Sequence, residues 1–288
     1  MKVQALAGVR RLLRRIRQTA YLSSHPIRHR ACANIIRSSQ LYLDRKTSFK
    51  YVGDHLALGL NPSQRREILA THYSVFPNFL QPAWVAELRG GVPIWRKRVG
   101  DGLPDLRITM EISKHAPMEG ELQLKFSFIK DLCVLTFTIA PGKIFGIPGS
   151  MVLFIGGVQG GIGIREEVRQ AARLNDEISP ALILILAVQA LAEAINVAEI
   201  IAVGENEQIS RRYAQMSFDY EQFWTKVGGT RRGNHYRLPM HSPQKPLSFV
   251  TANHRSRARR RRETKAAIRQ MLDKRFRELL TPSVRRSS

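Results

Sequence analysis

The chain has 288 residues, with 46 Lys and Arg against 23 Asp and Glu, which gives a formal net charge of +23. Hydrophobic residues make up 43% of it, enough to close a core, and this excludes a wholly disordered chain. Its two cysteines, Cys32 and Cys133, are far apart in the sequence and form no C-x-x-C pair. We therefore expect no disulfide framework, thiolate zinc site or thioredoxin-like redox site.

The positive charge is concentrated at the two ends of the chain. Residues 1–50 contain 12 Lys and Arg against one acid, and residues 251–288 contain 13 against three. We therefore expect a basic N-terminal arm over 1–50, a globular domain over 51–252, and a basic C-terminal helix and tail over 253–288. Such arms attract polyanions, for which an anionic membrane surface and nucleic acid are the two candidates.

The N-terminal arm predicts an amphipathic helix. Its apolar side chains gather on one side of the helix, and the other side carries Arg10, Arg11, Arg14, Arg15 and Arg17. This pattern is typical of a helix that lies in a membrane interface, where each basic residue contributes about 1 kcal/mol. Packing on the protein's own core and a mitochondrial presequence are alternatives. The longest apolar run, 181–192, is shorter than the roughly 20 residues of a membrane span. The N-terminus also lacks the apolar core of a secretory signal.

The first part of the body combines helical and alternating patterns. Asn61 followed by Pro62 is typical of an N-cap with proline at the first helical position. His72 lies within that helix without a histidine three or four residues away, so we interpret it as a core-edge residue and not a ligand. The runs 122–128 and 133–139 alternate apolar and polar residues across a short turn, which predicts an antiparallel hairpin.

The second part predicts two parallel strands joined by a buried helix. The apolar run Met151–Ile155 leads into a glycine-rich loop over 156–163 and an amphipathic stretch. Ser179, as N-cap, and Pro180 then open a helix that is apolar nearly all round, and the strand Glu199–Val203 follows. This order indicates a right-handed crossover unit.

Ligands of open α/β sheets bind at the carboxyl ends of the strands, which places the glycine-rich loop opposite the segment after residue 203. The candidate site residues are Gln159, Gly160, Gly161, Gly163, Glu205 and Asn206. Backbone N–H groups of a glycine-rich loop before a helix suit an anion. Glycines that let the backbone turn tightly or approach another strand are the alternative interpretation. Neither a Walker nor a G-x-G-x-x-G spacing is present, and we expect no metal site.

The last part predicts a helix over 213–227, short strands over 235–238 and 247–251, and a long helix over 254–280. The first half of the long helix is rich in arginine: Arg255, Arg257, Arg259, Arg260, Arg261 and Arg262. The helix dipole favours cations at the other end, so this placement does not serve helix stability. We interpret these residues as a phosphate-binding face, of which Arg259 to Arg262 are the centre; a merely solvated face is the alternative.

Several stretches resemble the VirK/YbjX family of bacterial proteins, a domain of unknown function. They are NPSQRREILATHYSVF (61–76), EGELQLKFSF (119–128), FIGGVQG (154–160), ILAVQALAEAINVAEIIAVGENEQI (185–209), FDYEQFWTKVGG (218–229), YRLP (236–239) and HRSRARRRRETKAAIRQML (254–272). The resemblance implies roles in virulence, surface-protein localisation and antimicrobial-peptide resistance. It also implies a cytoplasmic protein that is peripheral to the inner membrane, and it assigns no catalytic residue.

The order of elements is also similar to the N-acetyltransferase-like (GNAT) fold, so the fold class is mixed α/β with a central mixed sheet, flanking helices and basic terminal helices. In that fold an acyl-CoA pyrophosphate rests on backbone amides, which here implies Gln159 to Gly163 as the cofactor site. Glu205 would then orient or deprotonate an amine acceptor. The fold's usual Arg/Gln-x-x-Gly-x-Gly/Ala spacing is broken, because Ile162 stands three places after Gln159. Three functions thus stay open: a peripheral membrane protein, an acyl-CoA-dependent enzyme and a non-specific nucleic-acid-binding protein.

Overall fold

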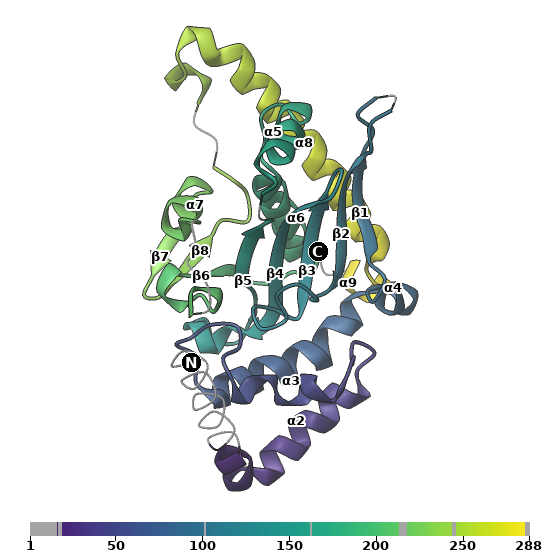
Figure 1. The fold of residues 1–288 in the computed structure, drawn as a ribbon, viewed down its shortest axis with the longest axis vertical. Helices are drawn as coiled ribbons and strands as arrows, with labels where there is room; N and C mark the ends of the chain where they lie inside the picture. The colour runs from purple at the N-terminus through teal and green to yellow at the C-terminus, as the bar shows by residue number, and fades with distance from the viewer. Residues whose placement is uncertain are drawn as a thin grey trace, which may run out of the picture.

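The computed structural model describes residues 16, 19–100, 102–161, 163–212, 218–243 and 246–285. Within them, one eight-stranded sheet has the order β1-β2-β3-β4-β5-β6-β8-β7 (Figure 1). Neighbouring strands are antiparallel except β5 and β6, which are parallel. The strands are β1 (Val92–Lys97), β2 (Leu106–Ile112), β3 (Leu122–Ser127), β4 (Asp131–Pro141), β5 (Met151–Gly160), β6 (Glu199–Val203), β7 (Thr230–Arg232) and β8 (His235–Leu238). The predicted mixed α/β class and the β3–β4 hairpin are confirmed.

Helices lie behind the sheet and below it in the view of Figure 1. The α-helices are α2 (Pro26–Ser38), α3 (Pro62–Phe79), α4 (Pro82–Glu87), α5 (Arg165–Leu174), α6 (Pro180–Ala194), α7 (Tyr220–Lys226), α8 (Ala252–Leu279) and α9 (Pro282–Arg285). Short 3-10 helices are η1 (Arg45–Val52), η2 (Gly142–Phe145), η3 (Glu205–Glu207), η4 (Ser210–Arg212) and η5 (Leu247–Phe249). Helix α6 packs on β3 and β4, and α8 packs on α6 and on the edge strand β1.

The N-terminal region contributes to the core. Helix α2 packs on α3, and its Cys32 and Ile36 side chains are buried. The predicted N-cap of α3 is confirmed: the Asn61 side chain accepts from Gln64, whose own side chain accepts from the Asn61 N–H. Of the predicted amphipathic N-terminal helix, Ile16 is described and exposed. The remainder of its polar side lies outside the described residues, namely Arg10, Arg11, Arg14, Arg15 and Arg17.

The predicted crossover between two parallel strands is confirmed. Strand β5 pairs in parallel with β6, with Val152 opposite Glu199, and α5 and α6 lie between them in the chain. Helix α6 is buried over most of its length, as its apolar sequence requires. Ser179 does hold the N-cap position with extended backbone, but its side chain makes no capping hydrogen bond. The fixed φ of Pro180 at the first position starts this helix without it.

Two predicted elements after β6 differ in the structure, and one strand, β7, was not predicted. The helix predicted over 213–227 begins at Tyr220 in the described residues, with Asp219 as its N-cap. The strand predicted over 247–251 is wrong, because this segment forms η5 and then enters α8. The sheet ends instead with the unpredicted strand β7, which pairs with β8. Strand β7 is exposed at every position, so its sequence carries no alternation to reveal it.

Candidate functional site

The predicted glycine-rich loop is mostly strand. Strand β5 does not end at Ile155 but continues through Gly160, so the expected strand-to-loop boundary is wrong by five residues. The pairing of β5 with β4 shifts here: Ile155 lies opposite Phe137, whereas Gly157 lies opposite Thr136. Gly156 is therefore the extra residue of a β-bulge, and the strand stays paired on both sides of it.

The reason for the glycines is the close approach of Glu119. A Cβ on Gly156 would overlap the Glu119 backbone carbonyl, and a Cβ on Gly157 would overlap its carboxylate. The structural interpretation, that these glycines let the backbone approach another segment, therefore holds at these two positions. A ligand is not needed to explain them.

The Gln159 side chain hydrogen-bonds to the same buried carboxylate, that of Glu119. Its Nε2 donates to Glu119 Oε2 at 2.7 Å and to Ser210 Oγ at 3.0 Å. Glu119 also accepts from Gln208 Nε2 at 2.9 Å and from the backbone N–H and the hydroxyl of Ser210. Burial raises the pKa of Glu119, and these hydrogen bonds oppose the rise. The Gln159 side chain is thus committed to the fold.

The predicted residues after Gln159 lie at the surface. Gly160, Gly161 and Gly163 are exposed where β5 leads into α5, and Gly163 has a φ of 72°, which favours glycine. Their backbone is accessible to a ligand. This part of the predicted anion site therefore differs from Gln159, whose amide faces inward.

Glu205 and Asn206 lie just past the carboxyl end of β6, as the crossover predicts. They share one partner, because Arg211 Nη1 donates to Glu205 Oε1 at 2.7 Å and to Asn206 Oδ1 at 3.2 Å. Glu205 lines an open hollow of about 710 Å³ together with Asp219 and Glu221. This hollow is rich in carboxylates, so it suits a cationic amine better than a phosphate.

A second buried carboxylate, Glu121, was not predicted. Lys50 Nζ lies 3.0 Å from its Oε2 and His55 Nε2 lies 3.1 Å from its Oε1, while the Tyr73 hydroxyl donates to Oε2 at 2.5 Å. Burial alone would raise the pKa of Glu121, but Lys50 and His55 outweigh it and hold that pKa well below its usual range. The sequence carried no signal for it, because Glu121 falls in the polar phase of the alternating run, with Gln123 and Lys125.

His72 was predicted at the edge of the core, but it is fully buried, beside this cluster. Its ring stacks on Phe76, and its Nδ1 accepts from the Ile139 N–H at 3.2 Å. Burial lowers the pKa of His72 to about 4, so the ring is neutral near pH 7. Among the described residues, no group of three or more His, Cys, Asp and Glu side chains is placed to hold a metal ion.

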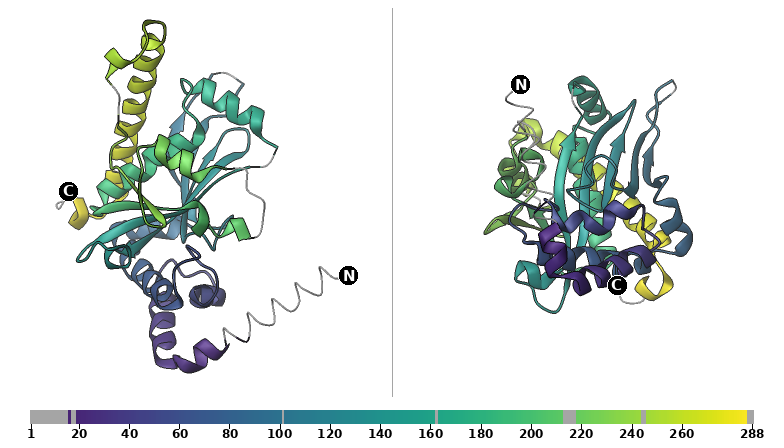
Figure 2. Two further views of the ribbon diagram at one scale, coloured as in Figure 1. Left: turned by 90° about the vertical axis from the view of Figure 1, so that its left-hand side faces the viewer. Right: turned by 60° about the horizontal axis from the view of Figure 1, so that its bottom comes forward.

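The basic half of α8 extends past the sheet. In Figure 1 its first turns rise at the upper left, and the left view of Figure 2 shows them standing clear of the body. Arg259 and Arg260 are exposed on them, whereas Arg261 and Arg262 are half-buried. Arg260 Nε lies 2.7 Å from Asp176 Oδ1, yet 67% of its side chain stays exposed. The four predicted arginines are thus divided between an outer surface and the side facing the body.

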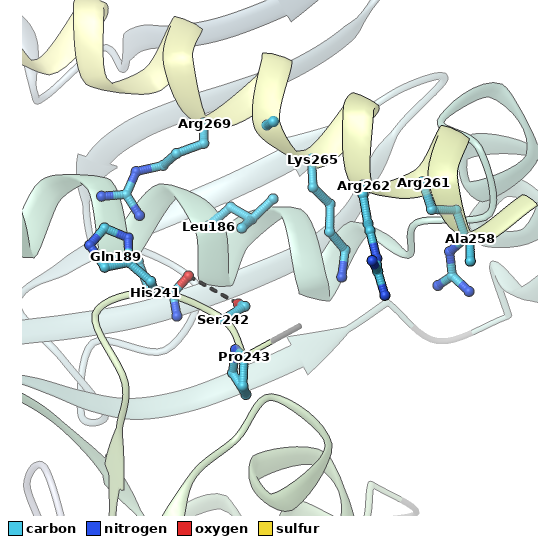
Figure 3. Close-up of a pocket in the computed structure, with 11 residues that line it drawn as sticks. Leu186, Gln189, His241, Ser242, Pro243, Ala258, Arg261, Arg262, Lys265 and Arg269 are labelled. Atoms are coloured by element: carbon cyan, nitrogen blue, oxygen red, sulfur yellow. Dashed lines mark hydrogen bonds between the residues drawn. The ribbon is translucent and has the colours of Figure 1, made fainter. Parts of the chain in front are cut away.

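The inward side chains line a pocket of about 470 Å³ between α8, α6 and the segment 241–243. Figure 3 shows Arg262 and Lys265 pointing from α8 toward Ser242 and Pro243. On the opposite wall, Gln189 of α6 accepts from Ser242 Oγ at 3.3 Å and donates to the Pro239 carbonyl at 2.8 Å. The pocket is lined by Leu186, Gln189, His241, Ser242, Pro243, Ala258, Arg261, Arg262, Lys265, Ala266 and Arg269, and none of these described residues is acidic.

The charges of this cationic pocket (the pocket lined by Arg261, Arg262, Lys265 and Arg269) are unevenly compensated. Arg269 pairs with Glu193 and, at 2.7 Å, with Asp273. Lys265, in contrast, makes no ion pair or hydrogen bond with any described residue. Burial lowers the pKa of Lys265, and the neighbouring cations Arg261, Lys226 and Arg262 lower it further. Sequence reasoning missed the pocket because its walls come from three separate segments.

The fold and these sites define a mixed α/β protein with a projecting basic helix and an adjoining cationic pocket. The chain belongs to the family described as Protein of unknown function (DUF535), whose model matches residues 9–274. The resemblance to the VirK/YbjX family is thereby confirmed.

Curated relatives carry no assigned function. The chain is 28% identical over 236 residues to the uncharacterized protein YbjX of Escherichia coli, a match that covers 77% of this chain and 70% of YbjX. Two uncharacterized proteins of Haemophilus influenzae are 28% and 24% identical, over 55% and 59% of this chain and 54% and 58% of their own lengths. The chain therefore spans little more than half of each of those two proteins. No solved structure matches it, and no described helix is long and apolar enough to cross a membrane.

Proposed function

We propose that this protein attaches to an anionic membrane surface, at the cytoplasmic face of the bacterial inner membrane, through η5 and the first half of α8. The attachment would serve the envelope roles that the family resemblance implies: virulence, surface-protein localisation or resistance to antimicrobial peptides. The observation that carries the proposal is the joint exposure of Phe249 and the arginines that follow it.

Phe249 supplies the apolar part of this surface. It is 81% exposed in η5, three residues before α8 begins, although a phenylalanine normally lies in a core. A single aromatic side chain that enters the interface between headgroups and acyl chains loses its contact with water, which favours binding.

The arginines supply the electrostatic part. Arg257 and Arg259 are exposed and make no ion pair with any described residue. Near an anionic leaflet each such residue contributes about 1 kcal/mol, so a few of them outweigh the modest apolar contact. An isolated basic surface would also attract nucleic acid, but the adjacent exposed Phe249 favours a lipid interface.

Flotation of the full chain with liposomes tests the proposal. We expect binding to vesicles that contain phosphatidylglycerol and little binding to phosphatidylcholine. The triple variant Arg255→Gln, Arg257→Gln, Arg259→Gln should lose most of this binding. Its matched control neutralises three exposed arginines of α2, Arg28, Arg30 and Arg37, and should keep most of it.

Two outcomes contradict the proposal. One is equal binding to neutral and anionic vesicles, and the other is the same loss in both triple variants. Salt-sensitive retention of DNA in a mobility assay, without any flotation, would instead assign the basic surface to nucleic acid.

The sheet supports a second candidate function, an acyl-CoA-dependent N-acyltransferase. What supports this candidate is a strand order with a parallel β5–β6 pair joined by a crossover and with β8 next to β6. Gly160, Gly161 and Gly163 leave backbone exposed before α5 for the cofactor, and Glu205 lines a carboxylate-rich hollow suited to an amine. Fold likeness alone does not establish activity. A thermal shift with CoA and acyl-CoA tests it, and no shift at millimolar ligand would reject it.

A further inference from the structure

We propose that the cationic pocket binds a phosphate group that carries at least two negative charges, as in a phosphomonoester or a diphosphate. The inference deepens the proposed membrane attachment, on which its lipid version rests: the phosphate would come from a lipid headgroup at that surface. A soluble phosphate compound is the other source of the same chemistry.

The spacing of the cationic residues on α8 places them on one side of the helix. Arg261, Lys265 and Arg269 are four residues apart, so they form one stripe on the helix, and Arg262 lies beside it. Like charges at this spacing repel each other and destabilise a helix. A stripe of three cations that faces the body, and not solvent, therefore needs a reason other than helix stability.

Arg269 at one end of the stripe already has its anions, Glu193 and Asp273. Arg261 and Lys265 have none among the described residues, and both are half-buried. Holding partly desolvated cations together without a counter-charge costs free energy, which a bound anion would offset. An anion is therefore expected to bind most favourably beside Arg261 and Lys265, the unpaired part of the stripe.

The opposite wall is built to complete such a site. Gln189, the buried polar side chain of α6, uses both ends of its amide to hold the segment after β8, at Pro239 and at Ser242. This places Ser242 and the His241 ring on the pocket wall. The Ser242 hydroxyl donates its one proton to Gln189, so the His241 ring is the group of the two that can donate to a phosphate oxygen. A volume of about 470 Å³ is ample for a phosphomonoester or diphosphate headgroup.

Lys265 also couples phosphate binding to proton uptake. Burial and the adjacent cations lower its pKa, and a bound dianion would raise it again. Phosphate binding should therefore be accompanied by proton uptake at a pH near or above the pKa of the empty site. The groups that face this side chain are Arg261 and Arg262 of α8 and Lys226 of α7.

Titration calorimetry of the full chain with pyrophosphate, at fixed ionic strength, tests the pocket. We expect pyrophosphate to bind at least tenfold more tightly than sulfate. Lys265→Met and Arg261→Gln should each weaken pyrophosphate binding at least tenfold, whereas Lys274→Gln, which removes the same charge from an exposed position of α8 outside the pocket, should change it less than twofold. Because Arg261 and Lys265 have no described partner, neither substitution strands a carboxylate. The Tm without ligand should therefore hold or rise, which verifies folding.

Two results would overturn the inference: no measurable pyrophosphate binding, or an equal loss in the Lys274→Gln control. The source of the phosphate is decided by flotation on vesicles of phosphatidic acid and of phosphatidylglycerol with matched surface charge. A preference for phosphatidic acid that Lys265→Met abolishes identifies a lipid phosphomonoester, and equal flotation on both identifies a soluble ligand. If the wild-type chain floats on neither, membrane attachment is contradicted, and the pyrophosphate titration still decides the pocket.

Discussion

The backbone of Glu119 crosses Gly156 so closely that no side chain fits at residue 156. A Cβ there would overlap the Glu119 carbonyl oxygen, which belongs to the backbone and cannot rotate away. Gly156 also forms the bulge that lets β5 stay paired with β4. This close contact joins the segment that carries Glu119 to the central strand β5. It therefore fixes the position of the buried Glu119 carboxylate.

We expect Gly156→Ala to destabilise the fold by about 3 kcal/mol or more, because the overlap forces one of the two backbones to move. Gly160→Ala is the control: the nearest atom to its added Cβ would be 3.9 Å away, in ordinary contact. Urea denaturation measures both. Equal stability of the two variants would contradict the structural role assigned to Gly156.

Glu121→Gln should lower the free energy of unfolding by about 3 kcal/mol, because it leaves Lys50 and His55 without the carboxylate that they contact. The matched control is Glu205→Gln, whose side chain is 37% exposed beside Arg211. A surface pair of this kind is worth about 0–1 kcal/mol. A loss in the control as large as in Glu121→Gln would show that burial of the cluster does not matter.

Because of His72, we expect the free energy of unfolding to fall already between pH 6.5 and pH 4, above the pH at which an ordinary carboxylate titrates. The pKa of His72 in the folded protein is about 4, below the ordinary value of about 6.5, so the unfolded state binds more protons between these values. Its contribution to stability is fully present above pH 6.5 and is lost as the pH falls toward 4. At pH 5 the loss is about 2 kcal/mol.

Chemical denaturation at pH 7 and pH 5 measures this loss. His72→Gln, which keeps an acceptor for the Ile139 N–H, should reduce the difference by about 2 kcal/mol, the share that His72 contributes. His254→Gln, at an exposed position on α8, should leave it unchanged. A wild-type chain that is equally stable at both pH values would refute the prediction.

Phe249→Ser should weaken vesicle binding several-fold without lowering the Tm, because this side chain is 81% exposed and packs on little. Flotation and a thermal melt of the same sample measure the two effects. Phe223→Ser offers a contrast: this ring contacts Phe218 and Trp224, so its loss should lower the Tm. If Phe249→Ser floats as well as the wild type, the apolar part of the proposed surface is wrong.

Periodic patterns predicted the central elements well. The alternation over 122–139 produced β3 and β4, and the nearly all-apolar helix after Pro180 became the buried helix α6 between two parallel strands. In these segments, whether a side chain is buried follows from its position in a regular helix or strand. The local sequence is therefore enough to predict both the element and its buried side.

The loop predicted at Gly156 and Gly157 was wrong because the reason for these glycines is not local. Glycines in a row indicate a loop, yet the residue that demands them, Glu119, is some 37 positions earlier in the chain. The same holds for the cationic pocket. The four-residue spacing of Arg261, Lys265 and Arg269 was visible in the sequence. It was not visible that Gln189 and Ser242, which are bonded to each other, line the same pocket.

Helix α8 is one uninterrupted rod of 28 residues, about 42 Å long. Its far end is clamped to the domain by buried Leu272 and Phe276 and by Arg275, which donates to the Pro93 carbonyl at 3.0 Å. A membrane or other surface that binds the first turns of α8 would therefore also fix the orientation of the sheet, because the helix is rigid and its other end is packed on the domain. The exposed backbone at Gly160 and the hollow beside Glu205 would then keep a constant height and orientation above that surface.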